Sequence, residues 1–307
     1  MKKFIIHSLR FAIFLLVLLI IEDFIVTCCY HSKDTRKYGV WNDILHSNID
    51  ADLLILGNSR AWSQYSPQIL DSILRINSYN IGLDGSAFNR QKARYDIYRH
   101  YQKKKPKYII QNVEFFTLEG YSIGYEREQF MPYLMFPYYR TRIKHEEPFS
   151  FGELYIPMYR YYKNNIYDDF TKYDYIIQKG YYGREMMWDD AKLKSMKPYI
   201  ANIDTTLLQL FTDYIEELQS DSIVPILVSA PVYTDATNVV LNINEINNLY
   251  KQIAEKYDIL FLDYSSGTLS MDTTYFLNAT HMNKLGAELF SLQLATDLDS
   301  LGIIDLE

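Results

Sequence analysis

The chain has 307 residues, of which 48% are hydrophobic and 22% charged, enough for a globular protein that buries a core. The formal net charge of -7 and the lack of a basic stripe disfavour nucleic acid as a partner. The two cysteines, Cys28 and Cys29, are adjacent, so we expect no disulfide framework and no cysteine metal site. The six histidines have no ligand-like spacing, and we expect neither a metal nor a cofactor.

Residues 1–30 read as a membrane anchor. Basic residues precede an unbroken apolar run, Phe11–Ile21, which alone is short for a helix that crosses a bilayer. The flanking segments Phe4–Ile6 and Phe24–Cys29 extend it to a spanning length. We therefore predict an uncleaved, single-pass signal anchor.

Two other readings of this segment remain open. A cleaved signal peptide fits the basic start, but no A-x-A-like cleavage site follows. A lipoprotein signal would place a small residue before Cys28, where this chain has Thr27. Basic residues lie on both sides of the apolar run, so their distribution barely decides the orientation.

The remainder, residues 31–307, alternates short apolar runs with amphipathic helical stretches. The predicted strands are Leu53–Leu56, Ile76–Gly82, Tyr108–Val113, Ile223–Ser229 and Ile259–Asp263. The predicted helices are Ala87–Lys104, Thr205–Leu218, Ile243–Tyr257 and Lys284–Leu298. This alternation predicts an α/β domain, a flavodoxin-like three-layer sandwich with a central parallel sheet of about five strands.

Residues 117–200 interrupt the alternation with many Tyr, Phe, Met and Trp residues. The stretch is too long for a simple connection. We predict an aromatic-rich insertion, which forms either a substrate-binding cap near the active edge or a packing appendage.

The stretch LLILGNSRAW at 53–62 places Ser59 on a turn between a strand and a probable helix. Ligands of open parallel sheets bind where the strands end. A serine there can attack a carbonyl, and its own N–H can help to bind an oxyanion. The structural alternative is a serine that only caps the helix. Arg60, which follows, is expected to fix the loop through a salt bridge rather than to bind an anionic substrate.

The stretch FLNATHMNKLGAELFS at 276–291 places His281 after the last strand and before the final helix. A histidine in such a loop can reach the end of the first strand of a doubly wound sheet. Ser59 and His281 are therefore the candidate nucleophile and base, although a lone histidine is more often structural.

These two segments resemble the first and last signature blocks of the SGNH (GDSL-like) hydrolases. In that family a GDS-type motif follows the first strand and a D-x-x-H motif precedes the last helix. The resemblance spans about residues 50–299 and is closest to the membrane-anchored branch of DltD-like and polysaccharide O-acetylation proteins. It implies a serine esterase or O-acyltransferase acting on an extracytoplasmic carbohydrate or envelope polymer, with a membrane-bound O-acyltransferase as a partner.

The resemblance also implies an oxyanion hole. The segment YNIGLDGSAF at 79–88 looks like the second family block, which makes Gly85 the backbone donor and Gly82 the fallback. The third block supplies an asparagine side chain, and Asn112 is the matching candidate. Glu114 falls at that place instead if the alignment shifts by two residues, and an ionised carboxylate would not stabilise an oxyanion.

The chain departs from the family at the triad carboxylate, where Asn278 replaces aspartate; Asn58 likewise replaces the aspartate of the first block. Asparagine can orient His281 but supplies no negative charge. Three accounts stay open: a Ser-His dyad, recruitment of Asp272 or Asp84, and a catalytically weakened site. A non-catalytic binding or assembly module that kept the fold is therefore the alternative function, and a membrane-tethered structural protein with chance motifs is the third.

Overall fold

The computed structural model describes residues 1–120, 127–163 and 177–304. The chain divides into two compact units, Met1–Asn42 with Glu126–Ile176, and Asp43–Tyr125 with Ile177–Glu307. The sequence predicts a boundary at residue 30, whereas the structure groups residues 31–42 with the N-terminal helix. Every residue of the candidate site belongs to the second unit.

The second unit is built on a five-stranded parallel sheet. Its strands are β1 (Leu53–Leu56), β2 (Ser78–Asn80), β3 (Tyr108–Asn112), β4 (Val224–Ser229) and β5 (Leu260–Asp263), in the order β2-β1-β3-β4-β5. This order is the flavodoxin-like one, in which the first and third strands lie together at the topological switch point. The predicted α/β sandwich is confirmed, and all five strands occur where the sequence placed them.

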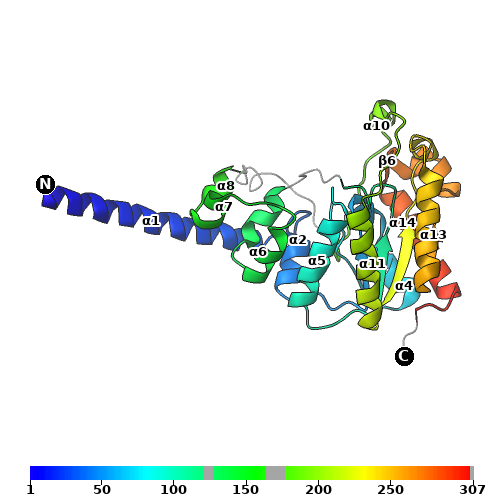
Figure 1. The fold of residues 1–307 in the computed structure, drawn as a ribbon, viewed down its shortest axis with the longest axis horizontal. Coiled ribbons are helices and arrows are strands. Elements are labelled where there is room, and N and C mark those ends of the chain that lie inside the picture. The colour runs from blue at the N-terminus through cyan, green and yellow to red at the C-terminus, as the bar shows by residue number, and fades with distance from the viewer. Residues whose placement is uncertain (121–126, 164–176, 305–307) are drawn as a thin grey trace. The chain divides into compact units, whose positions relative to one another are not determined.

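Helices cover the sheet in two groups. The first group is α3 (Ser59–Gln64), α4 (Pro67–Leu74) and α14 (Lys284–Ser300), and the second is α5 (Phe88–Tyr101), α11 (Thr205–Ser220) and α13 (Ile243–Tyr257). Figure 1 shows α5, α11 and α13 in front of the strands. The predicted helices are thus confirmed.

Alternate strand residues build the core beneath the first group. Leu53 and Ile55 of β1 lie in one buried cluster with Leu70 of α4 and with Phe290 and Leu294 of α14. The alternation follows from the period of two in a strand, while α4 contributes its apolar face at helical spacing. Because α14 packs here, the segment that precedes it is brought to the sheet beside α3.

That preceding segment forms a small antiparallel pair, β6 (Phe276–Asn278) and β7 (His281–Met282). The short helices α10 (Ala191–Ser195), α12 (Thr234–Thr237), η2 (Thr268–Met271) and η3 (Thr273–Tyr275) complete this unit. The helix α2 (Gly39–Leu45) spans the boundary between the two units.

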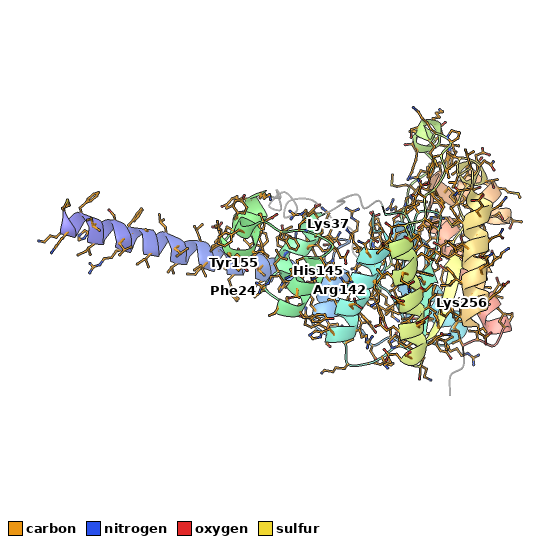
Figure 2. All side chains as sticks on the ribbon, in the orientation of Figure 1. Phe24, Lys37, Arg142, His145, Tyr155 and Lys256 are labelled. Atoms are coloured by element: carbon orange, nitrogen blue, oxygen red, sulfur yellow. The ribbon has the colours of Figure 1, made fainter. Side chains whose placement is uncertain are left out.

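The first unit contains α1 (Lys2–His31), η1 (Arg127–Tyr133), α6 (Pro137–Ile143), α7 (Phe151–Tyr155) and α8 (Tyr159–Lys163). The helix α1 is long and apolar enough to cross a membrane. Its side chains are exposed from Lys2 to Ile21, and Figure 2 shows them projecting from the ribbon. Asp23 ties its far end to α8, because it pairs with Arg160 and accepts a hydrogen bond from the N–H of Met158 at 2.8 Å.

The predicted insertion, residues 117–200, is divided between the units. Residues 126–176 group with α1, and residues 117–125 and 177–200 belong to the unit that carries the sheet. The parts at 121–126 and 164–176 lie outside the described residues. Among the described residues, the members of the insertion that line the candidate pocket, Arg184, Lys192 and Met196, come from its last part.

Gly57, which joins β1 to α3, has a backbone conformation that favours glycine, with φ at +147°. A Cβ atom there would lie 2.6 Å from Ala61 Cβ and 2.8 Å from Asn112 Cβ. We expect Gly57→Ala to lower the free energy of unfolding by about 2–4 kcal/mol, through overpacking and backbone strain. Urea unfolding of the full chain in detergent measures this.

The matched control is Gly267→Ala, because Gly267 has an extended backbone and no neighbouring atom within 4 Å of an added Cβ. Its free energy of unfolding should stay within about 0.5 kcal/mol of the parent. Equal stability of the two variants would contradict the tight turn at Gly57.

Candidate active site

Ser59 occupies the turn where β1 ends. Asn58 caps α3, since its Oδ1 accepts a hydrogen bond from the N–H of Arg60 at 3.1 Å. Ser59 is then the first residue of that helix, and its side chain is not the cap. Its Oγ is free to face another group, while its backbone N–H points out of the first helical turn, where no intrahelical acceptor exists.

His281 meets Ser59 across 222 positions of sequence. Its Nε2 lies 2.8 Å from Ser59 Oγ, within hydrogen-bond distance. β7 holds the histidine immediately before α14, and α14 packs against α3 and α4. The structure therefore brings together the two residues that the sequence selected as nucleophile and base.

Neutral oxygen atoms surround the other imidazole nitrogen. His281 Nδ1 lies 3.0 Å from Thr280 Oγ1 and 3.3 Å from Asn278 Oδ1. Asn278 Oδ1 also accepts hydrogen bonds from the N–H groups of Thr280 and His281, at 3.0 and 3.1 Å. A proton on Nδ1 can thus be accepted by a neighbour, which leaves the Nε2 lone pair for the Ser59 hydroxyl.

Neither alternative carboxylate takes the place of the missing aspartate. Asp272 caps η3 by accepting a hydrogen bond from the N–H of Thr274 at 2.8 Å. Asp84 lines the pocket and lies 3.9 Å from Arg184. Within residues 1–120, 127–163 and 177–304, no carboxylate oxygen approaches an imidazole nitrogen of His281 within 4 Å. Thr280, which sequence reasoning missed, stands there instead.

The proposed oxyanion donors differ in whether they line the pocket. Ser59 and Gly85 both line the pocket, and Gly85 has φ at +61°. The N–H of Gly82 donates to Asn80 Oδ1 at 2.9 Å, which removes it as a fallback. Two backbone N–H groups are therefore the candidate donors.

The structure does not bring Asn112 into the oxyanion hole. Its Nδ2 donates to Glu114 Oε1 at 3.3 Å, and its Oδ1 accepts from the Tyr65 hydroxyl at 2.7 Å. The side chain is buried and is absent from the pocket lining. Both the donor and the acceptor of the Asn112 side-chain amide are therefore engaged, as is usual for a buried polar side chain.

Arg60, which lines the pocket, forms a buried ion pair with Glu114. The Arg60 guanidinium also lies 5.4 Å from the centre of the Phe115 ring, and its Nη1 donates to the carbonyl of Ala230 at 3.5 Å. Burial raises the pKa of Glu114, and the positive charge of Arg60 opposes that rise. Arg60 thus holds the nucleophile turn to the ends of β3 and β4, which is the structural role that the sequence favoured.

A pocket of about 410 Å³ opens beside the Ser-His pair. Its lining residues are Ser59, Arg60, Asp84, Gly85, Phe115, Phe116, Arg184, Lys192, Met196, Thr280 and His281. Arg184, Lys192 and Met196 come from the end of the insertion and were not selected from the sequence. Among the described residues no group of three His, Cys, Asp or Glu side chains is placed to hold a metal ion.

The surroundings of His281 disfavour its charged form. Burial lowers its pKa well below the ordinary value of 6.5, and the positive charges of Arg184, Lys192 and Arg60 lower it further. The imidazole is therefore neutral at pH 7 and can accept a proton. The same charges oppose the imidazolium that forms when it does so.

Comparisons with known proteins find no matching family model and no matching curated protein. The chain is similar to the solved structure of a lipolytic protein of the G-D-S-L family from Desulfitobacterium hafniense DCB-2, with 16% identity, 80% of this chain and 99% of that chain covered, and a TM-score of 0.43. It is also similar to the acetyl xylan esterase AlAXEase, with 10% identity, 81% and 98% covered, and a TM-score of 0.42. At these similarities neither neighbour assigns an activity to this chain, and the side-chain geometry carries the proposal below.

The pKa of His281 predicts the pH dependence of Ser59 reactivity. The base must be neutral, and its lowered pKa keeps it neutral below pH 6.5. The rate constant for labelling of Ser59 by a neutral fluorophosphonate should therefore stay level to below pH 6.5 before it falls. Removal of a cation in Arg184→Gln raises the pKa and should move this acid limb to higher pH.

The control is Lys194→Gln, because Lys194 is exposed and pairs with Asp190, the residue that precedes its helix. It should leave the acid limb unchanged. If Arg184→Gln leaves the acid limb of the pH profile where it is in the parent chain, the electrostatic account of the site is wrong.

Proposed function

We propose that this chain is a membrane-anchored SGNH-like serine esterase or O-acyltransferase. The observation that carries the proposal is the 2.8 Å contact between Ser59 Oγ and His281 Nε2 at the wall of a pocket. The backbone N–H groups of Ser59 and Gly85 at the same pocket supply the electrophilic side of the reaction.

The chemistry follows from these atoms. His281 Nε2 takes the hydroxyl proton as Ser59 Oγ attacks the ester carbonyl, and the resulting oxyanion faces the N–H groups of Ser59 and Gly85. Collapse of this intermediate breaks the bond to the alcohol, which leaves with the proton from His281. Water or an acceptor hydroxyl then loses a proton to His281 and attacks the acyl-enzyme. The bond between the acyl carbon and Ser59 Oγ breaks, and His281 returns the proton to that oxygen.

Hydrolysis and transfer share this acyl-enzyme and differ in the nucleophile that reaches it. The resemblance to the membrane-anchored branch favours an extracytoplasmic carbohydrate or envelope polymer as the substrate and a membrane-bound O-acyltransferase as the partner. The aromatic side chains of Phe115 and Phe116 at the pocket suit the apolar face of a sugar ring.

The alternative function is an SGNH-fold binding or assembly protein for glycan modification. Its support is the uncharged partner of His281 and the engaged amide of Asn112. Both features remove groups that lower the barrier of acyl transfer, but they leave the pocket intact.

Membrane attachment rests on α1 and on the exposed side chains near its polar end. The helices α7 and α8 expose Phe151, Tyr155, Tyr159 and Tyr162, and the unit also exposes Phe24 of α1. Figure 2 labels Tyr155 and Phe24. Aromatic side chains with an apolar ring are enriched at membrane interfaces. The ion pair between Asp23 and Arg160 fixes α8 beside the end of the apolar helix, where an interface would lie.

Ser59→Ala tests the enzymatic proposal. The full chain in detergent should hydrolyse aryl acetates and react covalently with a fluorophosphonate at Ser59. The variant should lose labelling and at least about 10³-fold in kcat/KM, since the nucleophile is gone. Ser220→Ala, on an exposed part of α11, is the control and should retain both signals. Labelling that is absent from the parent chain, or that persists in Ser59→Ala, would leave the binding-protein alternative.

The anchor is tested separately by alkaline carbonate extraction of membranes. The parent chain should stay in the membrane pellet, whereas a variant with Leu16→Lys and Leu18→Lys should be released. Each lysine at the centre of a spanning helix costs about 3 kcal/mol. A variant with isoleucine at the same two positions is the control, and release of the parent chain would refute the anchor. Protease accessibility in intact cells tests the extracytoplasmic placement.

A further inference from the structure

Arg184 is a cation held rigidly at the wall of the pocket. Its guanidinium lies 5.2 Å from the centre of the Trp62 ring and 5.8 Å from that of Tyr182. Its carbonyl accepts a hydrogen bond from the N–H of Lys284 at 2.8 Å, which ties the backbone to the start of α14. The side chain is largely buried, and its Nε has no hydrogen-bond partner among the described residues. A guanidinium that lies against two aromatic rings at the wall of a pocket is suited to bind an anionic group.

Lys192 adds a second cation to the pocket lining. It lies on α10, where its neighbour Leu193 and nearby Met196 pack against a small buried cluster of Val232, Ala236 and Ala279. The N–H of Asp189 donates to the carbonyl of Leu277 at 2.8 Å and fixes the start of this segment beside β6. Among the described residues, Lys192 forms no ion pair, in contrast to Lys194 on the same helix.

The charges around His281 leave the pocket positive. Arg60 is neutralised by its buried contact with Glu114. Asp84 stands 3.9 Å from Arg184, at the limit of an ion pair. Lys192 is left with no carboxylate partner within the part of the chain that the structure describes. One negative charge is therefore missing from the space that Arg184, Lys192 and His281 share.

The same site also lacks the negative charge that a triad carboxylate would place beside His281. Proton transfer from Ser59 creates an imidazolium that Asn278 and Thr280 can orient but not neutralise. Arg184 and Lys192 oppose that imidazolium as long as the pocket holds no anion. An anion bound between them would offset their charge at the moment when His281 becomes cationic.

We propose that Arg184 and Lys192 bind an anionic group of the substrate, a carboxylate or phosphate near the ester, and that this group replaces the missing triad carboxylate electrostatically. The proposal rests on the esterase function above and names its substrate class: esters that carry an anion on the acyl or alcohol part. The anion forms no covalent bond and takes no proton; it stabilises the protonated His281.

A matched pair of aryl acetates tests the substrate class. With the full chain in detergent, 4-acetoxybenzoate should exceed 4-acetoxybenzamide in kcat/KM by about tenfold or more, after each is divided by its rate with hydroxide. In the double variant Arg184→Gln, Lys192→Gln this preference should fall to near one. Lys194→Gln should keep the preference of the parent.

Covalent labelling of Ser59 separates the two possible failures. Labelled protein with no preference for the anionic ester overturns the anion site and leaves the esterase proposal intact, whereas an unlabelled Ser59 defeats the esterase proposal itself. Equal loss of rate for both esters in the double variant also overturns the anion site, because it assigns the cations to the oxyanion instead. Labelling of the double variant by fluorophosphonate shows that its site has folded.

Two further measurements address the anion and its electrostatic role. Benzoate and phenyl phosphate, as probes, should slow labelling of the parent but not of the double variant, and their ranking separates carboxylate from phosphate. Asn278→Asp restores a carboxylate near Nδ1 and should raise the rate of the neutral ester more than that of the anionic one. Absence of protection by either probe, or an equal gain for both esters, contradicts the proposal.

Discussion

The buried ion pair between Arg60 and Glu114 is the constraint on which the site depends. It joins the first turn of α3 to the segment that follows β3, and Arg60 also lines the pocket. Breaking such a pair leaves an uncompensated buried charge, which costs about 3–5 kcal/mol. Ser59 is therefore positioned by its neighbour in sequence, and the strong contact of that neighbour fixes the turn without occupying the nucleophile.

Electrostatics distinguish this site from a complete Ser-His-Asp arrangement. The distance between Ser59 and His281 is suited to proton transfer, and the low pKa of the imidazole keeps the base in its neutral form. The ground state is thus favourable, while the charged state that follows has only neutral partners at Nδ1. The rate of acyl transfer depends on what stabilises the charged imidazole of His281. The cations of the pocket act on that charge and are therefore as important as the dyad itself.

The sequence was informative wherever local pattern decides structure. Short apolar runs marked all five strands, and the turn after Leu56 and the loop before α14 located Ser59 and His281. It failed at Asn112, because the choice between the pocket and the Tyr65–Glu114 network is made by tertiary contacts that no motif spacing records. Arg184 and Lys192 were not selected from the sequence for a similar reason. A cation in an aromatic-rich stretch gives no periodic signal, and only folding brings Arg184 to Trp62 and the pocket.

The origin of the pocket walls has an evolutionary consequence. The hydroxyl, the imidazole and the two backbone donors come from the sheet and its flanking turns, whereas Arg184 and Lys192 come from a stretch that forms no strand of the main sheet. Under the proposed function, selectivity and reactivity are thereby encoded in separate parts of the gene. Exchange of the short stretch alone would let one scaffold diversify toward new esters while its chemical machinery stayed unchanged.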